Sequence, residues 1–257
     1  MAEQIEIPPT FAAGGDVTGK RVVITGAGRG LGRLLAHAFS HAGARVALVA
    51  RTERELKEVA DELPGECLVL PGDVTDAERN DEIADATVAA WDGVDAWIAN
   101  AGISPVVGGP LETEPAAWRE VVDVNLTGAF LGARAAARVM GDGGRLVFTG
   151  SVLGERPAKG LSAYSASKAG LVGLAKSLAL DLAPITVNVV APGWFDSPLA
   201  EGWKANPKRE DAILGHTALG RWGGATDLAG AYQFLVSDAA AFVTGTVITV
   251  DGGYLLA

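Results

Sequence analysis

Residues 25–32 of the chain read Thr-Gly-Ala-Gly-Arg-Gly-Leu-Gly, and this stretch decides the fold. It follows the apolar run 21–24, which predicts a buried strand, and leads into residues 31–42, which have a helical pattern. Such a turn brings backbone N–H groups and the positive end of a helix dipole up to a phosphate. The residues that leave room for a pyrophosphate are Gly26, Gly28, Gly30 and Gly32. Taken alone, the pattern also fits a tight turn that binds nothing.

Length and composition favour one large α/β domain. The chain has 257 residues, 49% of them hydrophobic, and a net charge of −10, which argues against a general nucleic-acid binder. The one cysteine, Cys67, excludes an intrachain disulfide and is expected in a buried strand. No apolar run is long enough to span a membrane, and residues 1–18 lack the features of a secretory signal. We therefore expect a loosely held arm over 1–18 and a cytoplasmic protein.

Strand-like and helix-like runs alternate over residues 19–257, with no break that suggests a second domain. The expected strands are 21–25, 45–50, 66–70, 95–99, 144–149, 185–190 and 246–250. The expected helices are 31–42, 52–62, 76–91, 113–140, 162–182 and 225–237. This alternation predicts a doubly wound, seven-stranded parallel sheet with helices on both faces. Residues 193–224 interrupt it as a long insertion, either a substrate lid or a surface insertion with its own small core.

The helix expected from residue 162 carries Tyr164 and Lys168, whose i, i+4 spacing puts them on one face. An ammonium group near a phenol lowers the phenol pKa, so that the tyrosine can exchange a proton with a carbonyl or alcohol oxygen. Ser151 follows a strand, at the edge of the sheet where ligands bind, and can hold the same oxygen. The alternatives are a lysine packed over a half-buried ring and a serine that caps a turn.

Two further polar segments lie where a site is expected. Asn100-Ala101-Gly102 directly follows the fourth strand. Asn125 falls within the expected helix 113–140, where its amide can bond backbone or water inside the helix.

The order and spacing of these motifs resemble the short-chain dehydrogenase/reductase family, in its compact single-domain branch. The residues that carry the resemblance are Thr25, Gly26, Gly30, Gly32, Asp73, Asn100, Ala101, Gly102, Asn125, Ser151, Tyr164, Lys168, Pro192 and Gly193. The resemblance extends from about residue 18 to Gly253. It implies a Rossmann fold and an oxidoreductase that transfers hydride between a nicotinamide cofactor and a substrate.

The resemblance also implies roles. Tyr164 is implied as general acid or base, with Lys168 lowering its pKa and Ser151 orienting the substrate carbonyl. Asn125 is implied to anchor a water behind Lys168. The implied cofactor residues are Thr25, Gly26, Gly30, Leu31, Gly32, Asp73, Val74, Asn100, Ala101, Gly102, Tyr164, Lys168, Pro192, Gly193 and Ser197. Ser197 stands near the place where the family usually has threonine, and a serine can make the same hydrogen bond.

The end of the second strand predicts NADP(H) as the cofactor. It carries Ala50 and Arg51 where an acidic residue would favour NAD, and Arg29 lies in the glycine loop. Two guanidinium groups suit a 2′-phosphate. The alternative is that Arg51 pairs with Glu55 one helical turn later.

The substrate pocket is expected to include Ser151, Leu153, Tyr164, Trp194 and Phe195. The sequence slightly favours a small ketone, sugar or polyol, since an acidic surface suits an acidic carrier protein poorly. A 3-oxoacyl-thioester reductase and a non-catalytic NADP(H)-binding sensor stay open as alternatives.

Helices 113–140 and 162–182 have more than one apolar face, so we expect a homodimer or homotetramer formed through them. The three histidines are too scattered for a metal site.

Overall fold

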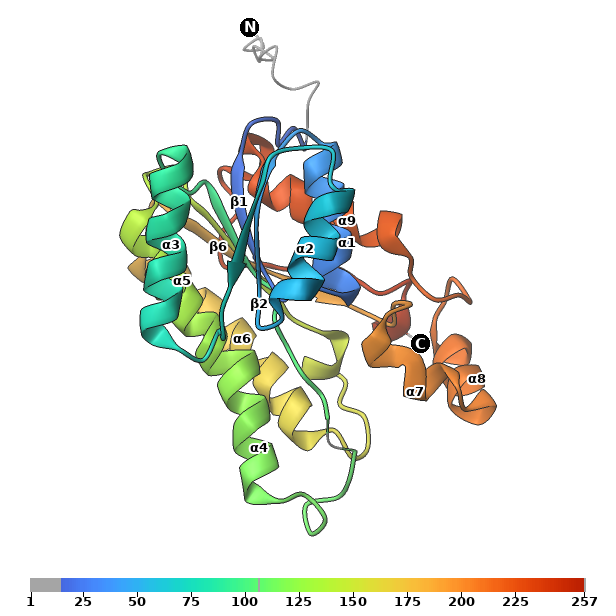
Figure 1. Cartoon of the computed structure of the whole chain (residues 1–257). Coiled ribbons are helices and arrows are strands. Elements are labelled where there is room, and N and C mark those ends of the chain that lie inside the picture. The colour runs from blue at the N-terminus through green and yellow to red at the C-terminus, as the bar shows by residue number, and fades with distance from the viewer. Residues whose placement is uncertain (1–14, 106, 257) are drawn as a thin grey trace, which may run out of the picture.

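The computed structural model describes residues 15–105 and 107–256. Over these ranges seven parallel strands form one sheet in the order β3-β2-β1-β4-β5-β6-β7 (Figure 1). The strands are β1 (Arg21–Thr25), β2 (Arg45–Ala50), β3 (Cys67–Pro71), β4 (Ala96–Ala99), β5 (Arg145–Thr149), β6 (Thr186–Pro192) and β7 (Val247–Val250). The helices are α1 (Gly30–His41), α2 (Glu53–Glu62), α3 (Ala77–Trp91), α4 (Pro115–Val122), α5 (Gly128–Val139), α6 (Ser162–Asp181), α7 (Glu201–Lys204), α8 (Pro207–His216) and α9 (Ala225–Val236).

Two hydrophobic cores lie on opposite faces of the sheet. Because side chains alternate along a strand, Ile24 faces the core under α1, α2 and α9, whereas Val23 faces the core under α3, α5 and α6. Figure 1 shows these two helix layers on either side of the strands. The predicted doubly wound Rossmann fold with seven parallel strands is therefore confirmed.

The chain changes direction between β1 and β4. From β1 it builds β2 and β3 outward, and it then returns across the sheet to place β4 on the other side of β1. Open α/β sheets bind ligands beyond the carboxyl ends of the strands at such a switch point. Here those ends are joined: Thr25 Oγ1 accepts the N–H groups of Asn100 (3.0 Å) and Ala101 (3.1 Å), and Asn100 Nδ2 donates to the Thr25 carbonyl (2.9 Å).

The prediction of a single helix over 113–140 is wrong in the middle of that range. The residues Asp123–Thr127 form a π-helical turn between α4 and α5. Asn125 lies in this turn and bonds both the N–H (2.8 Å) and the carbonyl (3.0 Å) of Ile103, outside the helix. Its amide therefore ties the turn to a neighbouring loop and does not bond backbone within its own helix.

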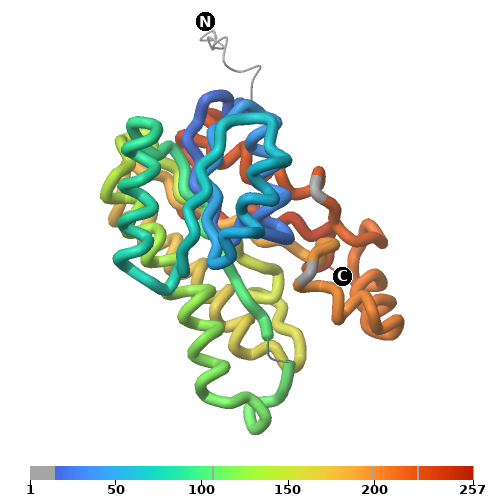
Figure 2. Tube along the Cα trace, viewed as in Figure 1, coloured from blue at the N-terminus to red at the C-terminus, as the bar shows by residue number. Residues whose placement is uncertain are grey.

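The insertion 193–224 contains two short helices, α7 and α8. In Figure 2 this orange segment stands out from the sheet and lies next to the C-terminal end of the chain. A hydrogen bond joins the insertion to this end of the chain: the Leu219 N–H donates to the Gly252 carbonyl at 3.0 Å. The last turn of the chain thus holds the insertion beside the sheet.

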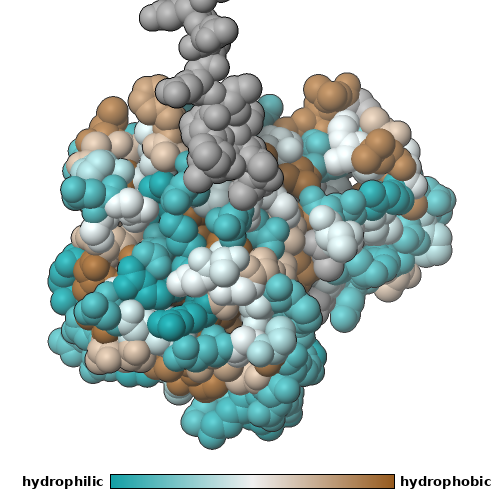
Figure 3. Space-filling view, turned by 90° about the horizontal axis from the view of Figure 1, so that it is seen from above, coloured by the Kyte–Doolittle hydropathy of each residue, from teal (hydrophilic) through white to brown (hydrophobic). Residues whose placement is uncertain are grey.

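The predicted arm 1–18 lies mostly outside the described residues, but Val17 is buried in the core under α1. Cys67, expected to be buried, is half-buried at the start of β3, and burial raises its thiol pKa. On the surface seen from above in Figure 3, apolar residues form separate patches among hydrophilic ones. No helix in the described ranges has the length and hydropathy required to cross a bilayer.

The glycine loop supplies a test of close packing. A Cβ at Gly32 would overlap the Gly26 carbonyl oxygen and lie 2.7 Å from Asn100 Nδ2, so we expect Gly32→Ala to destabilise the fold by about 3 kcal/mol. The control is Gly215→Ala in α8, where a Cβ meets nothing within 4 Å and alanine favours the helix by about 0.5–1 kcal/mol. Urea unfolding of both variants measures this difference, and equal midpoints would contradict it.

Candidate active site

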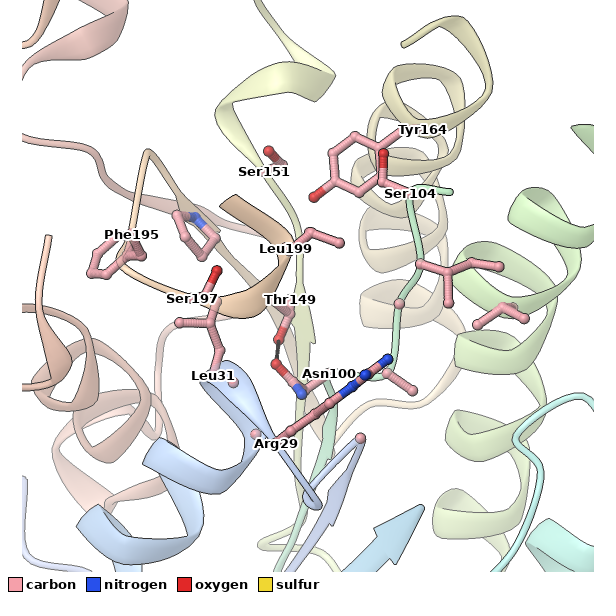
Figure 4. A pocket seen from close by; sticks show the side chains of 18 of the residues that line it. Arg29, Leu31, Asn100, Ser104, Thr149, Ser151, Tyr164, Phe195, Ser197 and Leu199 are labelled. Atoms are coloured by element: carbon pink, nitrogen blue, oxygen red, sulfur yellow. Dashed lines mark hydrogen bonds between the residues drawn. The ribbon is translucent and has the colours of Figure 1, made fainter. Parts of the chain in front are cut away.

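A cavity of about 440 Å³ opens beyond the carboxyl ends of the central strands, between the glycine loop and the insertion. Figure 4 shows Arg29 and Leu31 at one end, and Ser151, Tyr164 and Leu199 at the other. Every residue predicted for the cofactor or substrate lines it except Thr25, and so do all the predicted catalytic residues except Asn125. Those two residues lie behind the wall, where they hold its backbone.

The glycine loop packs tightly against the end of β4. Gly26 has φ = +69°, and a Cβ there would lie 2.9 Å from the Ala101 Cα. Gly26 and Gly32 are therefore required by contacts within the protein, in addition to the predicted reason of leaving room for a ligand. The N-terminus of α1 has no side-chain cap among the described residues and no acid in its first turn. Its free N–H groups fit a phosphate.

Tyr164 and Ser151 lie next to each other in the wall at one end of the cavity (Figure 4). Tyr164 comes from the first turn of α6, and Ser151 follows β5. Burial raises the pKa of the Tyr164 phenol, and a hydrogen bond with the Ser151 side chain partly offsets this effect. The predicted lowering of this pKa by Lys168 is not found here, because loss of water around the phenolate has the larger effect.

Lys168 is a buried cation on the same face of α6. Its side chain is 3% exposed, and its Nζ donates to the Thr149 carbonyl at 2.7 Å. Nζ also lies 5.7 Å from the centre of the Tyr164 ring, as the i, i+4 spacing predicts. Burial lowers the pKa of Lys168 to about 8. The ammonium group is thus held beside the tyrosine at a cost in solvation.

Asn125 and Lys168 meet around Gly102. A Cβ on Gly102 would lie 3.4 Å from both Asn125 Oδ1 and Lys168 Nζ. Asn125 is 1% exposed, and its amide nitrogen also donates to Ser167 Oγ at 3.1 Å. This residue therefore fixes the loop after β4 against α6, next to the lysine.

Thr149 is a wall residue that the sequence reasoning missed. Its hydroxyl bonds the Tyr232 hydroxyl at 2.7 Å and donates to Asn100 Oδ1 at 3.3 Å. Burial raises the pKa of Tyr232, so this phenol stays protonated. The sequence does show that Thr149 is a polar residue at the end of a buried strand, which could have indicated a site residue. Its partner Tyr232 on α9 comes next to it only when the chain folds.

The opposite end of the cavity carries Arg29, Arg51, Glu55 and Asp73. The alternative pairing of Arg51 with Glu55 is not found among the ion pairs of the described residues. Glu55 instead packs over the glycine loop, with Oε2 3.0 Å from the place of a Cβ on Gly28. Asp73 accepts the Thr75 N–H (2.9 Å) and hydroxyl (2.8 Å), which shapes the turn after β3.

The walls beyond Ser151 and Tyr164 are mainly apolar. We call this part the substrate end and define it by Ser104, Leu153, Leu161, Trp194, Leu199 and Trp203. Trp194 packs on Trp203, with ring centres 5.2 Å apart. Phe195 also lines the cavity but is only 5% exposed and belongs to the core under α9. Gly28, predicted to leave room for a pyrophosphate, lines the cavity, and the other lining residues absent from the prediction are Ala50, Thr52, Gly72, Ile103, Val124, Gly150, Val152 and Ala200.

Known proteins are similar to this chain in sequence and in fold. The family model described as enoyl-(acyl carrier protein) reductase matches residues 26–255. The 3beta-hydroxysteroid dehydrogenase 1 of Eggerthella lenta is 37% identical over 251 residues, which cover 94% of this chain and 95% of that protein. The chain belongs to the short-chain dehydrogenase/reductase family.

Other members of this family match over most of their length. The 3-oxoacyl-[acyl-carrier-protein] reductase FabG of Escherichia coli (strain K12) is 35% identical, with 91% of this chain and 97% of that protein covered. A short-chain dehydrogenase from Burkholderia cenocepacia J2315, solved in complex with NADP, is 32% identical with a TM-score of 0.84, covering 93% of this chain and 99% of that one. The chain is thus an oxidoreductase of a family that uses nicotinamide cofactors.

The buried charge of Lys168 predicts a pH-dependent stability. Between about pH 8 and 10.5 the unfolded lysine holds a proton that the folded one has lost, so folded wild type gains stability as pH rises through this window. Lys168→Met lacks this contribution. We expect the stability of the variant relative to wild type to fall by about 3 kcal/mol between pH 7 and pH 10.5. Urea unfolding at several pH values measures the difference, and a difference independent of pH would refute it.

Proposed function

We propose that this protein is an NADP(H)-dependent oxidoreductase that interconverts a ketone and a secondary alcohol. One observation carries the proposal. A buried lysine, a tyrosine and a serine converge at one end of a cavity whose other end is a glycine loop with free N–H groups. A protein that only sensed the cofactor would have no chemical need for this convergence.

The proposed mechanism assigns each group a task. Ser151 holds the substrate oxygen, and Tyr164 gives that oxygen a proton in reduction or removes it in oxidation. At neutral pH the phenol keeps its proton because burial raises its pKa, which suits reduction. Lys168 places positive charge beside the phenol and favours the phenolate that is left after proton transfer. The nicotinamide, when bound, supplies or accepts the hydride.

We expect Tyr164→Phe to lower kcat for ketone reduction by roughly 100- to 10,000-fold, since the variant has no acidic proton to give. The Kd for NADPH, measured by fluorescence titration, should stay within about twofold of wild type. Turnover at the parental rate would refute the mechanism, and NADPH binding without any turnover in the wild type would favour the sensor interpretation. Loss of NADPH binding would instead place Tyr164 in the binding of the cofactor alone.

A second candidate is a 3-oxoacyl-thioester reductase. The similarity to FabG of Escherichia coli favours it, at 35% identity over nearly the full length of that protein. The same three catalytic residues would serve it, because a 3-oxo group is also a ketone.

Two arginines support NADP(H) over NAD(H). Arg29 and Arg51 both line the cavity. Among the described residues, neither guanidinium group forms an ion pair. A 2′-phosphate carries the negative charge that such donors bind. The Glu55 and Asp73 carboxylates at this end of the cavity oppose this attraction, so the preference rests on the two arginines outweighing the two carboxylates.

We expect Arg51→Ala to raise the Kd of 2′,5′-ADP about tenfold while the Kd of 5′-AMP hardly changes, because only the first ligand has a 2′-phosphate. The matched control is Arg54→Ala, one turn away on α2, where the arginine is exposed and paired with Glu58. Calorimetric titration measures both ligands. Equal losses for the two ligands would contradict the assignment.

We also propose that the protein forms a homodimer or homotetramer in the cytoplasm. Exposed aromatic residues on the two halves of the interrupted helix support this, since Trp118 on α4 is 37% exposed and Phe130 on α5 is 42% exposed. A second copy would cover them.

A further inference from the structure

The substrate end of the cavity carries no charge on its walls. Of the six residues that define it, five are apolar or aromatic and Ser104 is neutral. Leu153 and Leu161 are buried, and they join Trp194, Trp203 and Tyr164 in one hydrophobic cluster. A ligand that enters past Tyr164 therefore exchanges water for indole rings and leucine side chains.

The charges of the insertion do not enter this space. Lys204 pairs with Asp196 at 2.9 Å, and its Nζ lies 5.5 Å from the centre of the Trp222 ring. Arg209 stacks on Trp203, with Cζ 4.9 Å from the ring centre. Neither cation is among the residues that line the cavity. A carboxylate on the substrate would thus be desolvated without a cationic partner, apart from Lys168, whose ammonium is bonded to the Thr149 carbonyl.

We propose that the substrate is a neutral ketone with apolar groups on both sides of the carbonyl, such as an alicyclic or aromatic ketone. This proposal rests on the proposed function, and it excludes keto acids, sugars and polyols from the preferred substrates. Hydroxyl groups lose hydrogen bonds to water when they enter an apolar wall, whereas apolar groups gain from burial. The shape of the walls agrees, because the faces of indole rings pack well on flat or ring-shaped hydrocarbons.

Two pairs of ketones of similar size test the substrate class. The ketones 3-pentanone and 1,3-dihydroxyacetone have the same number of heavy atoms, and we expect kcat/KM with NADPH to favour 3-pentanone about tenfold or more. The electron-withdrawing hydroxyls make dihydroxyacetone the more reactive ketone, so chemistry alone predicts the opposite order. Methyl 3-oxocyclohexanecarboxylate should likewise exceed the free acid about 100-fold. Equal or reversed preferences in both pairs would overturn the proposal.

A variant with a new charge tests whether the substrate binds at the substrate end of the cavity. Leu199 points into the cavity beside Tyr164 in Figure 4 and is half-exposed, so the surface can accommodate a longer side chain there. We expect Leu199→Arg to raise the acid-to-ester ratio of kcat/KM about tenfold, while Leu199→Gln, which adds polarity without charge, leaves that ratio near the parental value. Leu219→Arg, at an exposed position outside the cavity, should not move the ratio. An equal change in Leu219→Arg would show that the effect is not local.

A binding measurement tests the apolar substrate end independently of the proposed catalytic function. If NADPH binds but no ketone is reduced, the proposed function fails, and the substrate class is then decided by affinity. Tyr164→Phe loaded with NADP+ is titrated with cyclohexanol and with glycerol, using the fluorescence of the cavity tryptophans. Tighter binding of cyclohexanol supports the apolar substrate end, and equal or tighter binding of glycerol overturns it.

Discussion

The junction between the ends of β1 and β4 is the contact on which the rest of the site depends. Thr25 accepts two hydrogen bonds from Asn100 there, and the glycine loop lies close enough that a Cβ at Gly26 would strike Ala101. This junction sets where α1 begins, and so where its free N–H groups point. It also fixes the loop after β4, which Asn125 then ties to α6. The glycine loop and the residues proposed to transfer the proton are thereby held in fixed positions relative to each other.

The buried charge of Lys168 lowers the stability of the fold at this site. Lys168 loses hydration in the fold, which lowers its pKa to about 8, and its bond to the Thr149 carbonyl offsets only part of that cost. The Thr149 side chain is in turn bonded to Tyr232 on α9. Burial raises the Tyr164 pKa, and the hydrogen bond with the Ser151 side chain acts against it by favouring the phenolate. Such opposed effects are typical of groups that must both hold and release a proton.

The sequence predicted the fold and most of the site for physical reasons that act locally. Apolar runs with turn residues between them specify strands, and strand-to-helix turns specify the edge where ligands bind. Thus Ser151, Tyr164 and Lys168 were found by their positions along the chain. The π-helical turn at Asn125 was missed, and the residue that Asn125 bonds, Ile103, lies 22 residues away in the chain. Thr149 was missed for the same reason, since Tyr232 lies 83 residues away.

By itself, the sequence determined the alternation of strands and helices, the glycine turn and the i, i+4 pair on α6, all of which depend on neighbours within a few residues. Only the tertiary structure decided the state of the groups in the cavity. Burial raised the Tyr164 pKa where the nearby lysine suggested a lowering, and the apparent partner of Arg51, Glu55, lies over Gly28. The charges of the insertion lie outside the cavity, which leaves its substrate end apolar. Solvation depends on every atom packed around a group, and that packing is a property of the whole fold.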